Sequence, residues 1–315
     1  MSVVRRGSAL NPARLLAGPH ARQEQVDALA EQYHLTGPIP ERYAAYMSGL
    51  LRGDLGMSVT TRRPVVEDLA QYLPATIELT ATAFLITVLL GVPLGILSAA
   101  KRGGPLDHAS RLLSIAGVSL PIFWLGLVLQ VLFYKHLGLL PLGGRLGTLD
   151  IEPPRVTGAY LIDSLLAGDF ALFRSALLHL LLPAATLAAG SLAVVTRMMR
   201  ASILETMGAD YVRTARAKGL GTGRILGRHV SRNVAPVVAT SLAVDVGVAL
   251  SGTLFVERVF GLPGLGFVGL RSVENLDYPL TVGVVVFGAA VAVLANTVVD
   301  VLQAVLDPRV RLGRA

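Results

Sequence analysis

The sequence predicts an all-α protein that crosses a membrane several times. Hydrophobic residues make up 53% of its 315 residues and charged residues only 16%, whereas soluble domains average about 25% charged residues. The mean hydropathy is +0.61. Long uncharged runs recur along the chain, and basic residues gather in alternate connections between them. These observations favour a polytopic helical membrane protein over a soluble one.

Five apolar runs are long enough to span a bilayer, which takes about 20 helical residues at about 1.5 Å each. Four of them lack Asp, Glu, Lys and Arg, and the fifth contains one carboxylate, Asp245. The four are residues 79–100, 112–134, 175–196 and 278–299, and the fifth is 233–256. Prolines in or beside these runs are tolerated in a membrane bundle, because neighbouring helices satisfy the freed carbonyls.

Basic residues between the runs predict the orientation. The connections 101–111 and 197–232 and the tail after residue 306 are strongly basic, and 197–232 holds eight Lys/Arg against two acids. The connections 135–174 and 257–277 are nearly balanced. The positive-inside rule therefore places the first three segments, with the C-terminus, in the cytoplasm and the other two outside.

The polar N-terminal region lies outside the membrane in this topology. Residues 1–18 have no apolar core of the kind that a signal peptide carries. We expect either that an upstream helix is missing through a late start assignment or that the region is translocated after synthesis. The predicted organisation is an external region, 1–73, a membrane domain, 74–306, with its cytoplasmic loop 197–232, and a cytoplasmic tail, 307–315.

The composition also bounds the kinds of site. No cysteine is present, so disulfides, zinc–cysteine sites and thiol chemistry are excluded. The net charge of +7 would suit nucleic acid, but excess Lys/Arg in a membrane protein ordinarily marks cytoplasmic loops. His179 has no second His or Cys at ligand spacing, so we expect a hydrogen-bonded residue there. We expect contact with the lipid bilayer, and no nucleic acid, metal or cofactor.

Residues 211–236 form a basic block between two apolar runs, without an acid and with clustered glycines. Asp210 is predicted to cap a short helix and Gly219 to end it. A second helix then places three arginines on one face at i, i+4 and i+8, namely Arg224, Arg228 and Arg232. The plainest interpretation is a loop that determines topology. Its small residues, Ala215, Ala217 and Gly219, instead favour a flat surface for close approach by a partner.

At this block the chain resembles a known family. "DYVRTARAKGL", with the "RH", "RN" and "P" that follow it within 210–236, resembles the cytoplasmic loop of ATP-binding-cassette (ABC) importer permeases of the dipeptide/oligopeptide subfamily. The general pattern is E-A-A, three residues, Gly, nine residues and I-x-L-P. "RTA" at 213–215 stands in the first three places, and Gly219 in the glycine place. Pro236 follows Gly219 by seventeen residues and not thirteen, a longer form that is similar to the peptide subfamily.

Other segments carry the same likeness in the same order, from residue 12 to residue 311. They are "GDLGMS" at 53–58, "RPV" at 63–65, "LPATIEL" at 73–79, "VERVFGLPGLG" at 256–266, "LDYPL" at 276–280 and "LDPRVR" at 306–311. "NPARLLAG" at 11–18 is similar to the stretch just after the family's first helix. The resemblance therefore implies a six-helix permease fold of which five helices are visible and the first is absent.

The resemblance implies a subunit of the bacterial or archaeal plasma (inner) membrane that forms half of a translocation pathway with a second homologous permease. Two cytoplasmic ATP-binding subunits would drive it, and an extracytoplasmic peptide-binding protein would deliver di- or oligopeptides. Nickel, glutathione or another small solute is the alternative cargo. The chain has no G-x-x-x-x-G-K-[ST] loop, so it is expected not to be an enzyme, and ATP hydrolysis falls to the partner. The coupling residues so implied are Arg213, Thr214, Ala215, Arg216, Ala217, Lys218, Gly219 and Leu220.

Asp245 is the one carboxylate inside a predicted span. Such a group costs about 2.5–3.5 kcal/mol on insertion scales, so it usually faces a cavity or a partner. Two interpretations stay open: a residue of the translocation pathway, or a protonated or hydrogen-bonded structural acid. A different class, an ion-gradient-driven secondary transporter, would need paired intramembrane charges and two related halves. The sequence shows one mid-span charge and no internal repeat.

Overall fold

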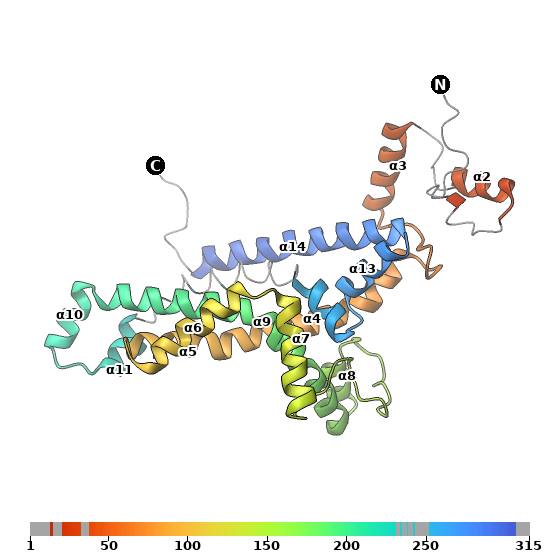
Figure 1. The fold of residues 1–315 in the computed structure, drawn as a ribbon. Helices are drawn as coiled ribbons and strands as arrows, with labels where there is room; N and C mark the ends of the chain where they lie inside the picture. Colours follow the sequence, from red (N-terminus) through yellow and green to blue (C-terminus); the bar gives the residue numbers. More distant parts are fainter. Residues whose placement is uncertain are drawn as a thin grey trace. The chain divides into compact units, whose positions relative to one another are not determined.

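The computed structural model describes residues 13–14, 21–32, 38–230, 234, 238, 242 and 252–306 (Figure 1). Over these residues the regular structure is helical, and the only β pairing is an isolated bridge between Met57 and Pro64. The predicted all-α fold is confirmed. The chain divides into two compact units, Met1–Tyr72 with Val268–Phe287 and Leu73–Phe267 with Gly288–Ala315.

Helices follow one another along the described part of the chain, with π-helical turns marked η. They are α2 (Gln23–Gln32), α3 (Ile39–Leu51), α4 (Val65–Ile86), η1 (Thr87–Gly91), α5 (Val92–Ala100), α6 (Pro105–Ser119), α7 (Ile122–Leu129), η2 (Gln130–His136), α8 (Tyr160–Leu166), α9 (Phe170–Met207), α10 (Asp210–Ala217), α11 (Thr222–Arg224), η3 (Ile225–Val230), α13 (Leu265–Glu274) and α14 (Tyr278–Leu306). Three helices here are long and apolar enough to cross a membrane, or up to five if each of two bent pairs is one span.

The first of the three, Val65–Ala100, contains the predicted span 79–100 and is unbroken although it contains two prolines, Pro74 and Pro93. Pro93 lies in the first turn of α5. A proline ring clashes with the carbonyl four residues earlier in an α-helix, and here that carbonyl belongs to the π-helical turn η1. The wider turn changes the local geometry at this point, so α4, η1 and α5 remain continuous.

The predicted span 112–134 is wrong as a continuous helix. α6 and the α7–η2 helix meet there at 116°. Leu120 is extended, with φ −87° and ψ 134°, because the ring of Pro121 disfavours the α conformation for the residue before it. Pro121 therefore divides this run instead of being tolerated within it.

The predicted external connection 257–277 contains a helix, which its near-balanced charge did not indicate. The helical segment Gly252–Phe260 and α13 form the second bent pair, at 82°. Most of the predicted span 233–256, with Asp245, lies outside the described residues. The remaining predicted spans, 175–196 and 278–299, fall within α9 and α14 and are confirmed as helical.

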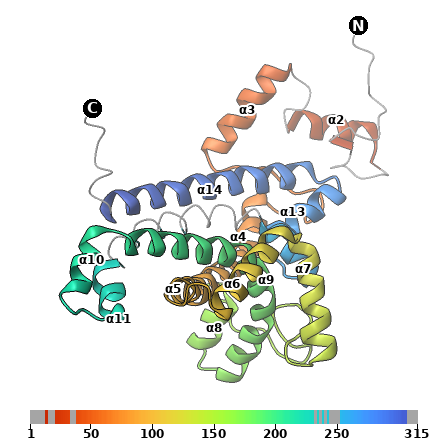
Figure 2. The same ribbon diagram turned by 60° about the vertical axis from the view of Figure 1, so that its left-hand side comes forward.

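Within the larger unit, α5 and α6 pack closely on α9 (Figure 2). A Cβ atom on Gly95 would lie 2.6 Å from Met199 Cβ, and one on Gly117 would lie 2.8 Å from the Ala189 carbonyl oxygen. Small residues at such contacts let helix backbones approach one another.

Two apolar clusters are found among the described residues of this unit. One joins α4, α9 and the segment 256–262; its members are Leu79, Ala83, Leu180, Leu182, Ala184, Leu187, Ala188, Val256, Phe260 and Leu262. The other, the loop cluster, joins α5, α9, α10 and η3; its members are Ala99, Val195, Met199, Ile203, Val212, Ala215, Ile225, Val230, Val234 and Val238. The loop cluster attaches the predicted coupling loop to the membrane helices.

In the smaller unit, the "GDLGMS" and "LDYPL" segments meet around one buried carboxylate. Asp277 accepts hydrogen bonds from Ser58 Oγ at 2.6 Å and from the Thr60 N–H at 2.9 Å. It also accepts from the Leu280 N–H at 3.2 Å, in the first turn of α14. Burial raises the pKa of Asp277, but these hydrogen bonds outweigh the effect, so its pKa lies below the ordinary value. Asp277 thus joins two segments that are more than 200 residues apart in sequence.

Candidate docking site on the basic loop

The short helix α10 follows directly after the end of α9 (Figure 1). Val212 is fully buried and Ala215 is 6% exposed. These two residues are three apart, so they lie on the same helix face, and both belong to the loop cluster. One face of α10 is therefore anchored to its own molecule, and the opposite face is left for other contacts.

The end of α10 has the hydrogen-bond pattern of a Schellman motif. The Gly219 N–H donates to the Arg216 carbonyl at 2.9 Å, and the Leu220 N–H donates to the Ala215 carbonyl at 3.2 Å. Gly219 has φ +81°, a conformation that L side chains rarely adopt. The prediction that Gly219 ends this helix is confirmed, and the reason is conformational: the reversal needs a left-handed residue.

The predicted coupling residues fall into two groups by exposure. Six are exposed: Arg213, Thr214, Arg216, Ala217, Lys218 and Gly219. Leu220 is half-buried, and Ala215 is buried. Ala215 therefore contributes packing, and the small residues available for close approach are Ala217 and Gly219. No heavy atom lies within 4 Å of a Cβ built on Gly219, so the space beside it is open.

One local prediction about this loop is wrong. Asp210 is the first residue of α10 and not its cap: Ala209 occupies the cap position, and no side chain caps the helix there. As an acid at a helix N-terminus, Asp210 still complements the helix dipole. The predicted second helix is observed as α11 continued by the π-helical turn η3, and the shared face of its three arginines stays a prediction. The Arg228 side chain and Arg232 lie outside the described structure.

The charge of the exposed face is positive. Arg213 makes an ion pair with Asp210 at 3.5 Å, with 76% and 95% of the two side chains exposed. Such exposed pairs contribute little and are screened by salt. Arg216 contacts Met207 Sδ at 3.9 Å. The exposed face of α10 therefore presents cationic side chains around two small residues, Ala217 and Gly219. This arrangement suits contact with a protein surface that carries acidic side chains.

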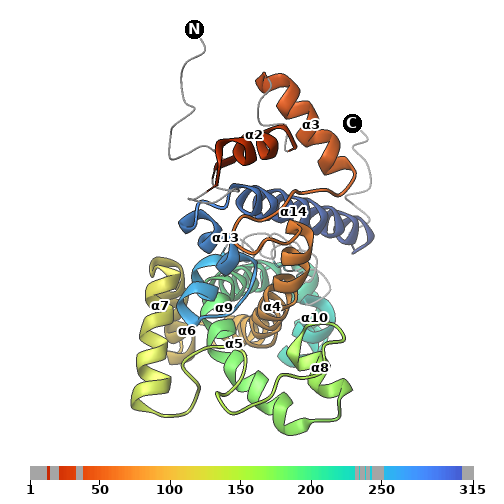
Figure 3. The same ribbon diagram turned by 90° about the vertical axis from the view of Figure 1, so that its right-hand side faces the viewer.

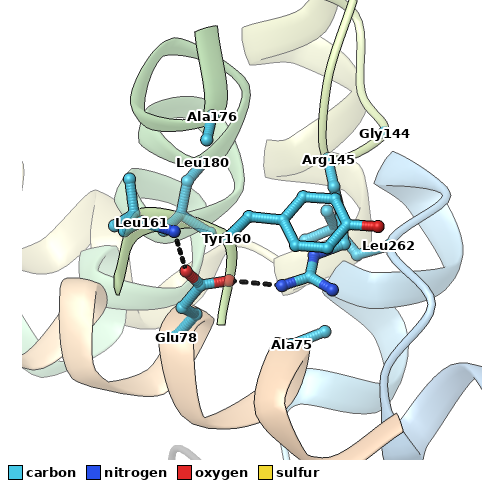
Figure 4. A pocket seen from close by; sticks show the side chains of 9 residues that line it. All are labelled: Ala75, Glu78, Gly144, Arg145, Tyr160, Leu161, Ala176, Leu180 and Leu262. Atoms are coloured by element: carbon cyan, nitrogen blue, oxygen red, sulfur yellow. Dashed lines mark hydrogen bonds and ion pairs between the residues drawn. The ribbon is translucent and has the colours of Figure 1, made fainter. Parts of the chain in front are cut away.

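Buried acids elsewhere in the larger unit were not foreseen from the sequence. Glu78 accepts from the Leu161 N–H and from Arg145 Nη2, each at 2.6 Å (Figure 4). The Arg145 guanidinium stacks on the Tyr160 ring, 3.5 Å from its centroid. Figure 4 shows these side chains closing a small pocket, whose other lining residues are Ala75, Gly144, Ala176, Leu180 and Leu262. The charges pair with each other here, so this site is structural.

Glu257 organises the "VERVFGLPGLG" segment in a similar way. It is fully buried and accepts hydrogen bonds from Thr76 Oγ1 at 2.7 Å and from the Phe267 N–H at 2.9 Å. Thr76 Oγ1 in turn accepts from the Leu265 N–H at 2.8 Å. These bonds satisfy N–H groups of the first turn of α13, which have no partner within a helix. A side chain on Gly264 would overlap the Glu257 carboxylate, which explains the glycine.

No metal site is found in the part of the chain that the structure describes: no three His, Cys, Asp or Glu side chains come together there. His179 Nδ1 lies 2.8 Å from the Ser175 carbonyl oxygen, in agreement with the hydrogen-bonded role predicted for it.

Comparison with known proteins agrees with this architecture. Residues 91–312 match the family described as "Binding-protein-dependent transport system inner membrane component". The chain is 44% identical to the probable D,D-dipeptide transport system permease protein of Escherichia coli K12, over 96% of this chain and 89% of that protein. It is 38% identical to the dipeptide transport system permease protein of the same strain, over 96% and 90%. It is also 34% identical to the glutathione transport system permease protein of Escherichia coli O6:H1, over 96% and 89%.

A solved structure shares the fold at low sequence identity. It is the inward-facing MetNI methionine ABC transporter, which matches with a TM-score of 0.55 and 16% identity over 76% of this chain and 96% of that chain. The family match and the relatives together cover most of the sequence. The chain therefore belongs to the binding-protein-dependent transport system inner membrane components, a family of multi-pass ABC importer permeases.

Proposed function

We propose that the chain is the permease subunit of an ATP-driven importer of di- and oligopeptides in a bacterial inner membrane. It forms half of the translocation pathway with a second, homologous permease. Two cytoplasmic subunits hydrolyse ATP, an extracytoplasmic binding protein delivers the peptide, and the C-terminus lies in the cytoplasm. The names of the relatives support the peptide cargo.

The observation that carries the coupling role is the construction of α10. It is anchored on one face through Val212 and Ala215, stopped by the left-handed Gly219, and exposed on its cationic face. A topology signal needs charge but no fixed shape. A rigid, one-sided helix with small residues at its exposed end is suited to a groove on a partner, and we assign that partner as the ATP-hydrolysing subunit.

The path from this site into the membrane is short. α9 is one helix of 38 residues that ends at Met207, and two residues separate it from α10. Val195, Met199 and Ile203 of α9 share the loop cluster with α10. Packed cores change arrangement as units rather than deforming smoothly. A displacement of α10 by a closing ATPase dimer would therefore move the end of α9 with it.

A transport assay tests this function. The chain is reconstituted in proteoliposomes with its second permease, ATPase and binding protein, and uptake of a radiolabelled dipeptide is measured with and without ATP. Uptake that requires ATP and the binding protein is the expected result. Uptake that persists without ATP and follows an ion gradient would instead indicate a secondary transporter.

The cargo is tested in the same system. Unlabelled dipeptides are expected to compete with the labelled dipeptide, whereas Ni²⁺ is expected to have no effect. Glutathione is the informative competitor, since it is itself a tripeptide and one relative at 34% identity is a glutathione permease. If only glutathione competes, the peptide assignment is replaced by glutathione and the permease role stands.

A further inference from the structure

We propose that the turn 101–104 between α5 and α6 is a second docking element for the same ATP-hydrolysing partner, next to α10. This inference rests on the proposed function. The turn is tight: the Lys101 N–H donates to the Leu97 carbonyl and the Gly104 N–H to the Lys101 carbonyl, both at 3.0 Å. Gly103, with φ +78°, makes the reversal possible.

A buried carboxylate holds this turn in one shape. Asp107 is 1% exposed, and its Oδ1 accepts from Ser98 Oγ at 2.7 Å and from Arg200 Nε at 2.6 Å. Its Oδ2 accepts from the Gly103 N–H at 2.9 Å and from Arg200 Nη2 at 3.0 Å. Both carboxylate oxygens thus have hydrogen-bond partners, and the two parallel bonds from Arg200 fix the orientation of the Asp107 carboxylate. The turn is locked to α9, which carries Arg200.

The same arrangement leaves the turn positively charged. Asp107 is the one acid in residues 101–111, and it is neutralised internally by Arg200. Lys101, Arg102 and Arg111 are exposed. A fixed pattern of exposed cations is more than the positive-inside rule requires, because that rule depends on charge and not on geometry.

The turn lies beside the candidate docking site. Ala99, two residues before Lys101, belongs to the loop cluster together with Val212 and Ala215 of α10. The views in Figure 1 and Figure 3 both place the end of α5 next to the α10–α11 segment. The cations of the turn therefore extend the cationic face of α10, which includes Arg213, Arg216 and Lys218.

The occupant that these observations favour is an acidic protein surface. Complementary charge steers such a surface to its site and selects its orientation. A lipid headgroup would also meet cations, but it does not need a turn fixed by a buried ion pair, nor one continuous with a docking helix. We assign the occupant as an acidic rim of the groove on the ATP-hydrolysing subunit that receives α10. The partner then contacts both the turn 101–104 and α10.

The absence of cysteine from the chain makes this testable by single-cysteine crosslinking. Three variants are placed in nanodiscs with the separately purified ATP-hydrolysing subunit of the same transporter: Arg102→Cys, Lys218→Cys and Leu149→Cys. Leu149 is 96% exposed in the connection 135–174 and serves as the control. Crosslinks from positions 102 and 218, but not from 149, are expected. A crosslink from 218 alone would overturn the second docking element and leave the proposed function intact, whereas none from either position would refute both.

Charge reversal gives a quantitative readout. Lys101→Glu combined with Arg102→Glu is expected to weaken binding of the ATPase subunit roughly tenfold, the sum of two exposed charge contacts. The salt dependence of binding should fall as well. The measurement is repeated in nanodiscs of purely zwitterionic lipid. If the effect of the double variant disappears there, the turn binds anionic lipid and the proposal is overturned.

Asp107 and Arg200 are positioning residues in this scheme. Asp107→Asn keeps every exposed cation but weakens the ion pair and hydrogen bonds that fix the turn 101–104. The ATPase subunit should therefore bind more weakly. The Lys101→Glu/Arg102→Glu pair should then cost less in the Asp107→Asn background than alone. A full additive loss in the combined variant would mean that Asp107 is merely structural. If Asp107→Asn does not fold, the crosslink from position 102 still decides the proposal.

Discussion

Gly219→Arg is expected to abolish coupled transport without preventing membrane insertion. Gly219 has φ +81°, and a non-glycine residue in that region costs about 1–2 kcal/mol. No heavy atom lies within 4 Å of its Cβ position, so the side chain itself meets no obstacle in the chain. The cost to folding is therefore local and small, whereas the arginine would occupy the space through which the partner approaches.

The size of the functional loss follows from interface energetics. A contact at the centre of an interface contributes about 2–3 kcal/mol when it is decisive, which corresponds to roughly 30- to 150-fold in affinity. We measure ATP-driven dipeptide uptake in proteoliposomes, ATPase binding to nanodiscs, and the amount of chain in the membrane. Gly219→Arg should weaken ATPase binding by about this factor and thereby abolish coupled uptake, at an unchanged membrane level.

Two matched variants separate docking from backbone strain. Gly168 has φ +72° and, like Gly219, open space at its Cβ position, but it lies between α8 and α9, away from α10. Gly168→Arg therefore carries the same strain and should retain uptake. Ala217 is helical and exposed, so Ala217→Arg adds the same side chain without the strain and should lose uptake. Normal uptake by Gly219→Arg, or an equal loss in Gly168→Arg, would refute the reasoning.

Further predictions concern stability, each checked by thermal unfolding in detergent. Gly95→Ala should destabilise the chain by about 1–3 kcal/mol through overpacking, because its Cβ would lie 2.6 Å from Met199 Cβ. Gly288→Ala, where nothing lies within 4 Å, is the control and should not destabilise. Glu257→Gln should lower the free energy of unfolding by about 1–3 kcal/mol, because the hydrogen-bond donors that now meet a carboxylate would meet a side-chain amide instead. An unchanged midpoint of thermal unfolding would contradict this prediction. Asp277 has a lowered pKa, so its stabilisation should be present above the unfolded pKa of about 3.9 and be lost as pH falls through the folded pKa. Asp277→Asn should remove the part of the acid-dependent loss that develops below about pH 5, as pH falls through the folded pKa, and a wild-type pH profile in that variant would contradict the assignment.

The sequence was most informative where one local property decided the outcome. Uncharged length predicted the helices that contain 79–100, 175–196 and 278–299, because a bilayer demands about 20 apolar residues whatever the neighbours are. Gly219 was identified as a helix end because few other residues adopt its conformation. The bend at Pro121 was also readable, since proline restricts the residue before it, but span length was given more weight there.

Tertiary structure decided what each polar or small residue contacts. From the sequence, Ala215 and Ala217 looked equivalent, yet the loop cluster buries one and leaves the other exposed. Asp107, Glu78 and Glu257 looked like charges at the ends of apolar runs, and the fold surrounds each with donors from distant segments. Helical periods and apolar lengths are properties of the local chain, so the sequence alone determined the class of protein and its family. The partner of a buried carboxylate is set by packing between segments up to 219 residues apart, and only the folded chain determines it.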